Sequence, residues 1–352
     1  MKRPFVDWQL LLPAIIILIF GLAAIFSISA PLGFNQLIFA FLGLIAFLVF
    51  ASFPYDSHRY LVWIYAFISI LLLILAFLFG TLTRGTVRWL QLGSLTIQPS
   101  EIIKPFLIII FSHFLSVKTT LFRYSLLLIL PVLLIFKQPD LGSALVIIAI
   151  WLGILISSKL SLFALIIITF LGFMATPLVW HQLQPYQQQR IISFSNPYAD
   201  PKISGYHSIQ SVIAVGSGGL RGKGLGYGPQ SQLNFLPERH TDFIFASLAE
   251  SWGFLGSTGL LIAYFFLLKR LLFISRQAPD QFSRLLGVGI FTLIFFQFTV
   301  NVGMNLGLLP ITGITLPLVS SGGSSLLATA ISLGLAHNLS RHLRLSSPLE
   351  IK

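Results

Sequence analysis

The chain has 352 residues, of which 56% are hydrophobic and 9% are charged, whereas a soluble domain carries roughly 25% charged residues. This composition excludes a water-soluble protein, because too few polar residues are available to cover a surface in water. The chain has no cysteine, which excludes disulfides and thiolate metal sites. Its net charge of +12 would suit a nucleic-acid partner, but the basic residues do not alternate with aromatic residues, so no such partner is expected.

Ten apolar runs follow one another along the chain, and each is close to the length of about 20 residues that a membrane-spanning helix needs. Lys2 and Arg3 precede the first run as in a signal peptide, but the length of that run indicates an uncleaved first helix. The sequence therefore predicts an all-α, polytopic membrane helix bundle that forms a single domain over residues 1–352. The predicted spans are 9–29, 36–53, 61–80, 101–117, 121–137, 141–157, 160–181, 243–268, 285–306 and 321–340.

The basic residues favour a cytoplasmic N-terminus, because the cytoplasmic loops of membrane proteins carry an excess of lysine and arginine. With that orientation, 13 of the 22 basic residues fall in cytoplasmic segments and four in short outer segments. An even number of spans returns the C-terminus to the cytoplasm as well.

The segment 182–242, between the seventh and eighth spans, is much longer than an ordinary connection and is therefore expected to be functional. It contains an apolar stretch at 209–215 and aromatic residues, so we expect it to pack partly into the bundle and to face the periplasm. It also holds the remaining five basic residues, which are Arg190, Lys202, Arg221, Lys223 and Arg239.

Six of the ten acidic residues fall in outer loops or at outer helix ends. An ionisable group at membrane depth costs about 2.5–3.5 kcal/mol, so such groups usually face a polar cavity. We expect a cavity of this kind near the outer face. The six residues are Glu101, Asp140, Asp200, Glu238, Asp242 and Glu250.

The first polar cluster combines residues 84–90 with residues 98–104. Pro99 suits the first position of a helix, and Glu101 in the first turn complements the helix dipole, which is a sufficient structural role. Lys104 lies one turn further into an apolar run. A buried lysine needs a partner, and Asp140 is the obvious candidate; the alternative is that Lys104 reaches out to the membrane interface.

The second cluster is glycine-rich, with seven glycines and two cations, Arg221 and Lys223, in the thirteen positions 216–228. Glycines allow backbone N–H groups to converge on an anion. The pattern is not a phosphate-binding Walker motif, because no serine or threonine follows Gly222 and Lys223. A merely flexible loop is the alternative.

The third cluster, residues 235–243, lies where the long segment re-enters the membrane. Asp242 is either the N-cap of the helix that follows or a carboxylate at the mouth of a cavity, suited to general-base catalysis. The fourth cluster, residues 307–325, is interrupted by Pro310 and Pro317. Broken backbone at membrane depth is tolerated where it lines a wet cavity, although a plain loop before the last helix has the same signature.

Together these clusters resemble the SEDS family (shape, elongation, division and sporulation). The stretches that carry the resemblance are RGTVRWLQLG with QPSEIIK, KQPDLGSA, NPYADPKISGYHSIQSVIAVGSGGLRGKGLG, FLPERHTDFIFASLAE and GLLPITGITLPLVSSGGSS, and they extend over nearly the whole chain. The resemblance implies an inverting peptidoglycan glycosyltransferase in the bacterial cytoplasmic membrane. Its substrates would be lipid II and undecaprenyl-diphosphate-linked glycan, surrounded by membrane lipid, and its partner a class B penicillin-binding protein.

The resemblance also implies roles for individual residues. It places the catalytic base at Asp242, which would deprotonate the sugar hydroxyl that attacks the lipid-linked donor. It requires no cofactor, although a divalent cation such as Mg²⁺ or Mn²⁺ could assist departure of the diphosphate, and it predicts no protein metal site. The expected substrate-binding residues are Lys104, Asp140, Glu101, Trp89, Arg84, Arg88, Arg221, Lys223, Glu238, His240 and Ser324.

Two positions depart from the family pattern, since Ser251 and Ser321 stand where many members have an acid and a tyrosine. The subtype stays open between cell elongation and cell division, because NPYADP resembles the division members and PITG the elongation members. Two other functions also stay open. One is a lipid II flippase, which would use the same polar cavity, and the other is a non-catalytic scaffold for a transpeptidase.

Overall fold

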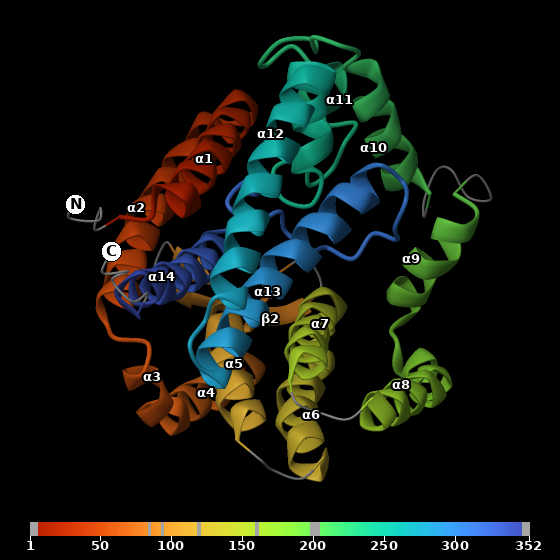
Figure 1. Cartoon of the computed structure of the whole chain (residues 1–352). Coiled ribbons are helices and arrows are strands. Elements are labelled where there is room, and N and C mark those ends of the chain that lie inside the picture. Colours follow the sequence, from red (N-terminus) through yellow and green to blue (C-terminus); the bar gives the residue numbers. More distant parts are fainter. Residues whose placement is uncertain are drawn as a thin grey trace.

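The structure is a computed structural model that describes residues 6–83, 86–92, 95–117, 121–158, 162–197 and 205–346. Each of the ten predicted spans coincides with a helix in these residues, and the helices form one bundle (Figure 1). The corresponding helices are α1 (Trp8–Ile28), α2 (Ala30–Ser52), α4 (Val62–Phe79), α5 (Pro99–Ser116), α6 (Leu121–Lys137), α7 (Leu141–Ser157), α8 (Leu162–Gln182), α12 (Ile244–Arg276), α13 (Gln281–Asn305) and α14 (Gly323–Ser346).

The number of helices that qualify as spans is smaller than the predicted ten. Within the described residues, six helices are both long and apolar enough to cross a membrane by themselves. Helices α6 and α7, with 17 residues each, fall at the lower end of the length that a membrane span requires. The six helices are α1, α2, α4, α5, α12 and α13.

Helix α13 is central, since it packs against α12, α7 and α5, while α14 packs along α2 and α1 along α12. Small residues permit the close approach that membrane helices use in place of a hydrophobic driving force. A β-carbon at Gly21 of α1 would lie 2.6 Å from the backbone of Val319, and one at Gly334 of α14 would lie 2.6 Å from the carbonyl oxygen of Phe47. Either substitution would force these elements apart.

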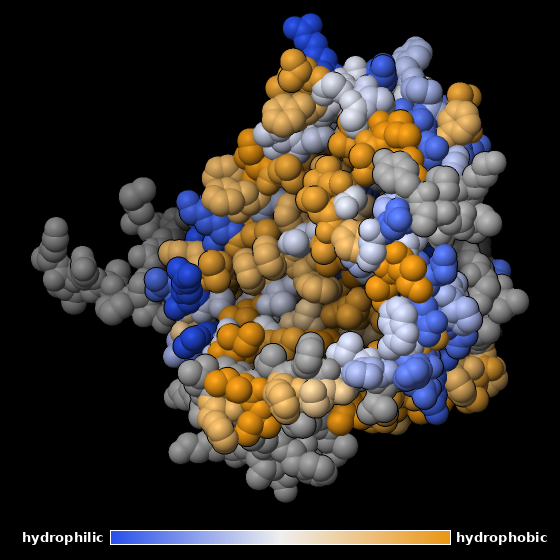
Figure 2. All heavy atoms as spheres, turned by 90° about the vertical axis from the view of Figure 1, so that its right-hand side faces the viewer, coloured by the Kyte–Doolittle hydropathy of each residue, from blue (hydrophilic) through white to orange (hydrophobic). Residues whose placement is uncertain are grey.

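The outside of the bundle is apolar. Phe41, Trp63, Phe67 and Phe79 are between 64% and 72% exposed, and Figure 2 shows hydrophobic residues spread over one face of the molecule. An exterior of this kind is stable in lipid and would aggregate in water. The exposed apolar side chains therefore agree with the multi-pass membrane protein that the composition predicts.

A small antiparallel sheet between α4 and α5 departs from the all-α prediction. Its strands are β1 (Thr81–Thr83), β2 (Thr86–Leu92) and β3 (Leu95–Ile97), in the order β1-β2-β3. β2 contains β-branched and aromatic residues that favour strands, and it pairs antiparallel with β1 on one side and β3 on the other. The sheet matters for function because β2 carries Arg88 and Trp89.

The long segment before α12 contains three further helices in its described part, which are α9 (Pro185–Ser195), α10 (Tyr206–Ser217) and α11 (Pro229–Gln232). A short helix, α3 (Ser57–Tyr60), lies between α2 and α4. α10 packs against α12, as expected of a segment that enters the bundle. α8 and α9 lie at the edge of the molecule (Figure 1), with only minor contacts to the other described elements.

Candidate active site

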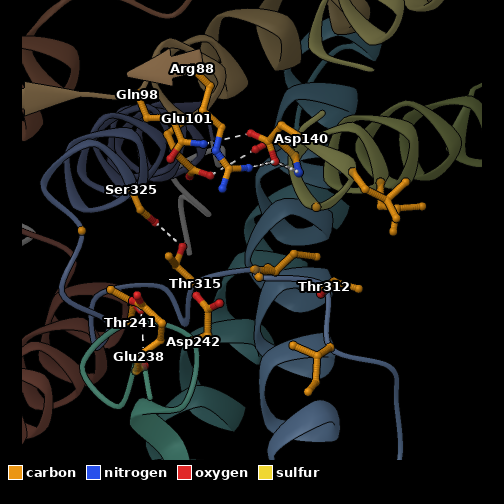
Figure 3. Close-up of a pocket in the computed structure, with 18 of the residues that line it drawn as sticks. Arg88, Gln98, Glu101, Asp140, Glu238, Thr241, Asp242, Thr312, Thr315 and Ser325 are labelled. Carbon is orange, nitrogen blue, oxygen red and sulfur yellow. Dashed lines mark hydrogen bonds and ion pairs between the residues drawn. The ribbon is translucent and has the colours of Figure 1, made fainter. Parts of the chain in front are cut away.

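A cavity of about 480 Å³ lies where β2, the first turns of α5 and α7, helix α9 and two loops meet. The first loop is 238–242, before α12, and the second is 310–322, which leads into the first turn of α14 with Ser324 and Ser325. Figure 3 shows Arg88, Gln98, Glu101 and Asp140 gathered on one side of the cavity, with Glu238, Thr241 and Asp242 on the other. Segments that are far apart in the sequence thus supply its two walls.

Asp140 forms the centre of the first wall. Its carboxylate is 3.3 Å from Arg88 Nη1 and accepts hydrogen bonds from Gln98 Nε2 at 2.8 Å and Ser100 Oγ at 2.9 Å. It also caps α7 by accepting from the backbone N–H of Ser143 at 3.2 Å. Burial opposes ionisation of this carboxyl, but Arg88 and the bonds from Ser143 outweigh it, so the pKa of Asp140 lies below its usual value. Asp140 is therefore an ionised structural anchor.

Lys104 forms its ion pair with Glu101, one turn earlier on α5. The prediction that Asp140 would be its partner is wrong. Lys104 is 1% exposed and Glu101 is 7% exposed, so neither reaches the membrane interface. A partner at i−3 on the same helix needs no further movement of the chain, whereas Asp140 is already engaged by Arg88. The role of Glu101 is accordingly to balance a buried charge, beyond any effect on the helix dipole.

Three buried polar atoms on the first wall have no hydrogen-bond partner among the described residues. They are Glu101 Oε2, Arg88 Nε and Trp89 Nε1. An unsatisfied buried polar atom costs about 1–3 kcal/mol, so native proteins retain few of them. All three residues line the cavity, so these unsatisfied groups belong to its wall.

The second wall centres on Asp242, which lines the cavity but does not cap α12. That helix begins at Ile244, and its N-cap residue is Phe243, whose side chain makes no capping hydrogen bond. The N-cap interpretation of Asp242 is therefore wrong.

Two buried asparagines of α13 hold the backbone at Asp242. Asn301 Nδ2 and Asn305 Nδ2 each donate to its carbonyl oxygen at 3.0 Å. Asn301 also donates to Ile314 O at 2.7 Å, and Asn305 Oδ1 accepts from the N–H of Ala246 at 3.0 Å. The sequence analysis missed this pair, although two asparagines four residues apart in an apolar run share one helix face and are costly to bury without a purpose.

The fourth sequence cluster lines the cavity, so it is more than a plain connection. Ser320 Oγ donates to Thr241 O at 2.7 Å, which ties this segment to the loop of Asp242. Ser324 Oγ accepts from the N–H of Gln98 at 2.8 Å, which ties it to the first wall. Ser324 thus joins the two walls of the cavity.

The glycine-rich cluster lies elsewhere. Its backbone N–H groups are used in the fold, since those of Lys223 and Gly224 donate to Glu250 O and Ser251 O at 2.9 and 3.0 Å. The loop packs into an interruption of α12 at Gly253, whose φ of 65° is strained for any side chain. Neither Arg221 nor Lys223 lines the cavity, so the structure does not bring them to the other candidate residues.

The remaining candidates divide between the cavity and its surroundings. Trp89 and Glu238 line the cavity, and Glu238 accepts a hydrogen bond from Thr241 Oγ1 at 2.8 Å. His240 lines a smaller neighbouring recess. Arg84 lies outside the described residues. Glu250 is fully buried and caps α11 by accepting from Gln230 N and Ser231 N.

Arg190 of α9 was noted in the sequence only as a loop cation, yet it lines the cavity. Its spacing of four residues from Tyr186, over which its guanidinium lies, is a signal that could have identified a positioned side chain. In the described part of the chain, no three histidine, aspartate or glutamate side chains are grouped as metal ligands, and we derive no step through a metal ion.

Comparison with known proteins gives a consistent result. The family model described as "Cell cycle protein" (FtsW/RodA/SpoVE) matches residues 8–345. The peptidoglycan glycosyltransferase MrdB of Escherichia coli is 40% identical over 320 residues, which cover 87% of this chain and 85% of that protein.

Two solved structures share the fold. A chain in a structure of a peptidoglycan synthase complex, concerned with the coordination of polymerization and crosslinking, aligns with a TM-score of 0.81 and 31% identity, over 96% of this chain and 98% of that one. The rod shape determining protein RodA of Thermus thermophilus aligns with a TM-score of 0.73 and 30% identity, over 96% and 97% of the two chains.

Proposed function

The chain belongs to the FtsW/RodA/SpoVE (SEDS) family of peptidoglycan glycosyltransferases, and we propose that it polymerises lipid II with Asp242 as the general base. The observation that carries this assignment is the position of Asp242 in the cavity, at the end of a loop whose backbone is held by Asn301 and Asn305. A base must be fixed within hydrogen-bond reach of the proton that it removes.

The proposed step is a displacement at carbon one of the lipid-linked sugar. The 4-hydroxyl oxygen of the acceptor sugar forms a bond to this carbon while Asp242 takes the hydroxyl proton. The bond from carbon one to the diphosphate oxygen breaks, and its electron pair leaves with the diphosphate. Attack opposite the leaving group inverts the configuration, so no second carboxylate is needed as a nucleophile.

The first wall would bind the sugars. Glu101, Arg88 and Trp89 line the cavity, and together their side chains carry acceptors and donors, which is a set suited to hydroxyl and amide groups. The ion pairs of Arg88 with Asp140 and of Lys104 with Glu101 balance the charge of this wall. The wall can therefore bind neutral sugar groups without carrying a net charge.

We further propose that the cavity opens at the outer face of the bacterial cytoplasmic membrane and that both termini are cytoplasmic, as the distribution of basic residues favours. We also propose a class B penicillin-binding protein as partner, since a related chain is found in a peptidoglycan synthase complex. The product would serve cell elongation or division.

The test is an assay of the purified protein in detergent with lipid II, with and without the partner. Formation of glycan polymer supports the glycosyltransferase. Movement of lipid II across vesicles without polymer formation would instead support the flippase, and the absence of both activities would support a scaffold.

A further inference from the structure

Among the described residues, three cationic side chains line the cavity, and two of them already balance a carboxylate. Arg88 pairs with Asp140 and Lys104 pairs with Glu101. The third, Arg190, makes no ion pair with any carboxylate in the described part of the chain. Its side chain is exposed at the cavity rim. Of the three, Arg190 is thus the cation whose charge is available to an incoming anion.

Helix α9 is fixed to the cavity edge just before this arginine. Tyr186 Oη and Gln187 Nε2 donate to the carbonyl oxygen of Pro139 at 3.0 and 3.4 Å, next to Asp140 of the first wall. One turn later, the Arg190 guanidinium carbon lies 5.7 Å from the centre of the Tyr186 ring. A contact with a ring face orients the guanidinium and leaves its N–H donors, which lie in the plane of the group, available for a ligand.

Arg190 and Asp242 approach the same point in the cavity from different elements. A β-carbon at Gly313 would lie 3.5 Å from Asp242 Oδ2 and 3.8 Å from Arg190 Nη1, so less than the sum of these distances separates the two groups. His207, whose ring centre lies 6.2 Å from that of Phe243 next to Asp242, is close enough to Arg190 for its charge to act on the imidazole. Burial and then the charge of Arg190 lower the pKa of His207, and Glu238 opposes them.

This separation suits a displacement in which the attacking and leaving groups are on opposite sides of one carbon atom. The base must lie beside the attacking hydroxyl, and a cation must lie beside the departing oxygen, so the two groups need a gap that the reacting atoms can fill. Two charged groups in direct contact would leave no such gap and would neutralise each other.

We propose that Arg190 binds the diphosphate of the lipid-linked donor and stabilises the charge that develops on its departing oxygen. This inference rests on the proposed glycosyl transfer and assigns the leaving-group site within it. Arginine suits the task because its planar fork can donate two parallel hydrogen bonds to phosphate oxygens, which the ammonium group of lysine cannot do.

The test measures binding of undecaprenyl diphosphate, the leaving group itself, to the purified full-length protein. Arg190→Gln should raise its dissociation constant about tenfold or more, and Arg190→Lys should raise it less, about threefold. Binding by the glutamine variant should also lose salt dependence. Lys137→Gln is the matched control, because Lys137 is an exposed cation two residues before Pro139 that does not line the cavity.

Undecaprenol, which has the same tail and no phosphate, should bind Arg190→Gln and wild type equally. Equal binding of undecaprenyl diphosphate to wild type and Arg190→Gln would overturn the assignment, as would the same loss in Lys137→Gln. Because binding of the leaving group requires no general base, this result is independent of Asp242. An active Asp242→Asn variant would disprove the proposed base and leave the Arg190 measurement intact.

Discussion

The two walls of the cavity hold their acidic residues in different ways. On the wall formed by β2, α5 and α7, Asp140 and Glu101 are buried beside cations that balance their charges. On the opposite wall, amide groups from α13 hold the backbone of Asp242 through its carbonyl oxygen. A contacting cation lowers the basicity of a carboxylate, whereas the bonds from the two asparagines fix the position of the Asp242 backbone. The comparison separates residues that build the cavity from the residue that we assign to the chemistry.

The sharpest test of this division is Asp242→Asn. The change keeps the shape of the side chain and removes its basicity, so polymerisation should fall by about 10²–10⁴-fold. The melting temperature should change little, because asparagine keeps the shape of the side chain and the bonds from Asn301 and Asn305 go to the backbone carbonyl oxygen. The rate of lipid II polymerisation and a thermal melt check both points, and activity within threefold of wild type would exclude the general-base role.

Changes in the first wall should instead act on stability. Lys104→Ala would leave Glu101 charged and buried, which costs about 3–5 kcal/mol when a buried pair is broken. The double variant with Glu101→Gln should cost less than the sum of the single changes. Thermal melts of the four proteins measure this coupling.

The same cycle between Lys104 and Asp140 is the control for that experiment. Their coupling should be smaller, because Asp140 has Arg88 as its own partner. A larger coupling between Lys104 and Asp140 than between Lys104 and Glu101 would contradict the observed pairing.

The asparagine pair offers a smaller and more selective change. Asn305→Ala removes one hydrogen bond to Asp242 O and leaves the N–H of Ala246 without its acceptor, at a cost of about 1–3 kcal/mol. If the pair positions the base, kcat should fall about tenfold with little change in KM for lipid II.

Ser211→Ala is the matched control, since Ser211 Oγ donates to the carbonyl oxygen of Asn305 at 2.9 Å and, in a longer contact of 3.5 Å, to Asn305 Oδ1, and the change leaves both donors to the Asp242 carbonyl oxygen in place. It should alter the melting temperature slightly and leave kcat unchanged. An equal loss of kcat in both variants would indicate a general loosening of α10 and α13 and would remove the positioning role.

The smallest effect is expected in the glycine-rich loop. Arg221 and Lys223 do not line the cavity. Replacing both with glutamine should therefore change the apparent KM for lipid II by less than about twofold, because exposed charges contribute little free energy to an interaction. Polymerisation rates at two ionic strengths provide the measurement. A clear rise in KM with a weaker salt response would return these cations to the binding site, as the sequence first suggested.

The membrane class and the positions of the helices follow from the sequence for a simple reason. In lipid every backbone polar group must be satisfied within the span, so an apolar run of sufficient length has little choice but to form a helix. The polar clusters at 84–104, 235–243 and 307–325 were equally visible, because charges and broken backbone at membrane depth are costly unless they surround a cavity.

Only the tertiary structure decided which of these residues meet. Lys104 had two carboxylates within plausible reach, and the choice of Glu101 depends on Arg88, which a strand unseen in the sequence delivers to Asp140. The glycine-rich loop had the composition of an anion site, but its N–H groups are bonded to the carbonyls of a helix interruption. Composition specifies what a segment can bind, whereas the partners that satisfy its hydrogen bonds and charges are set by packing between elements far apart in the chain.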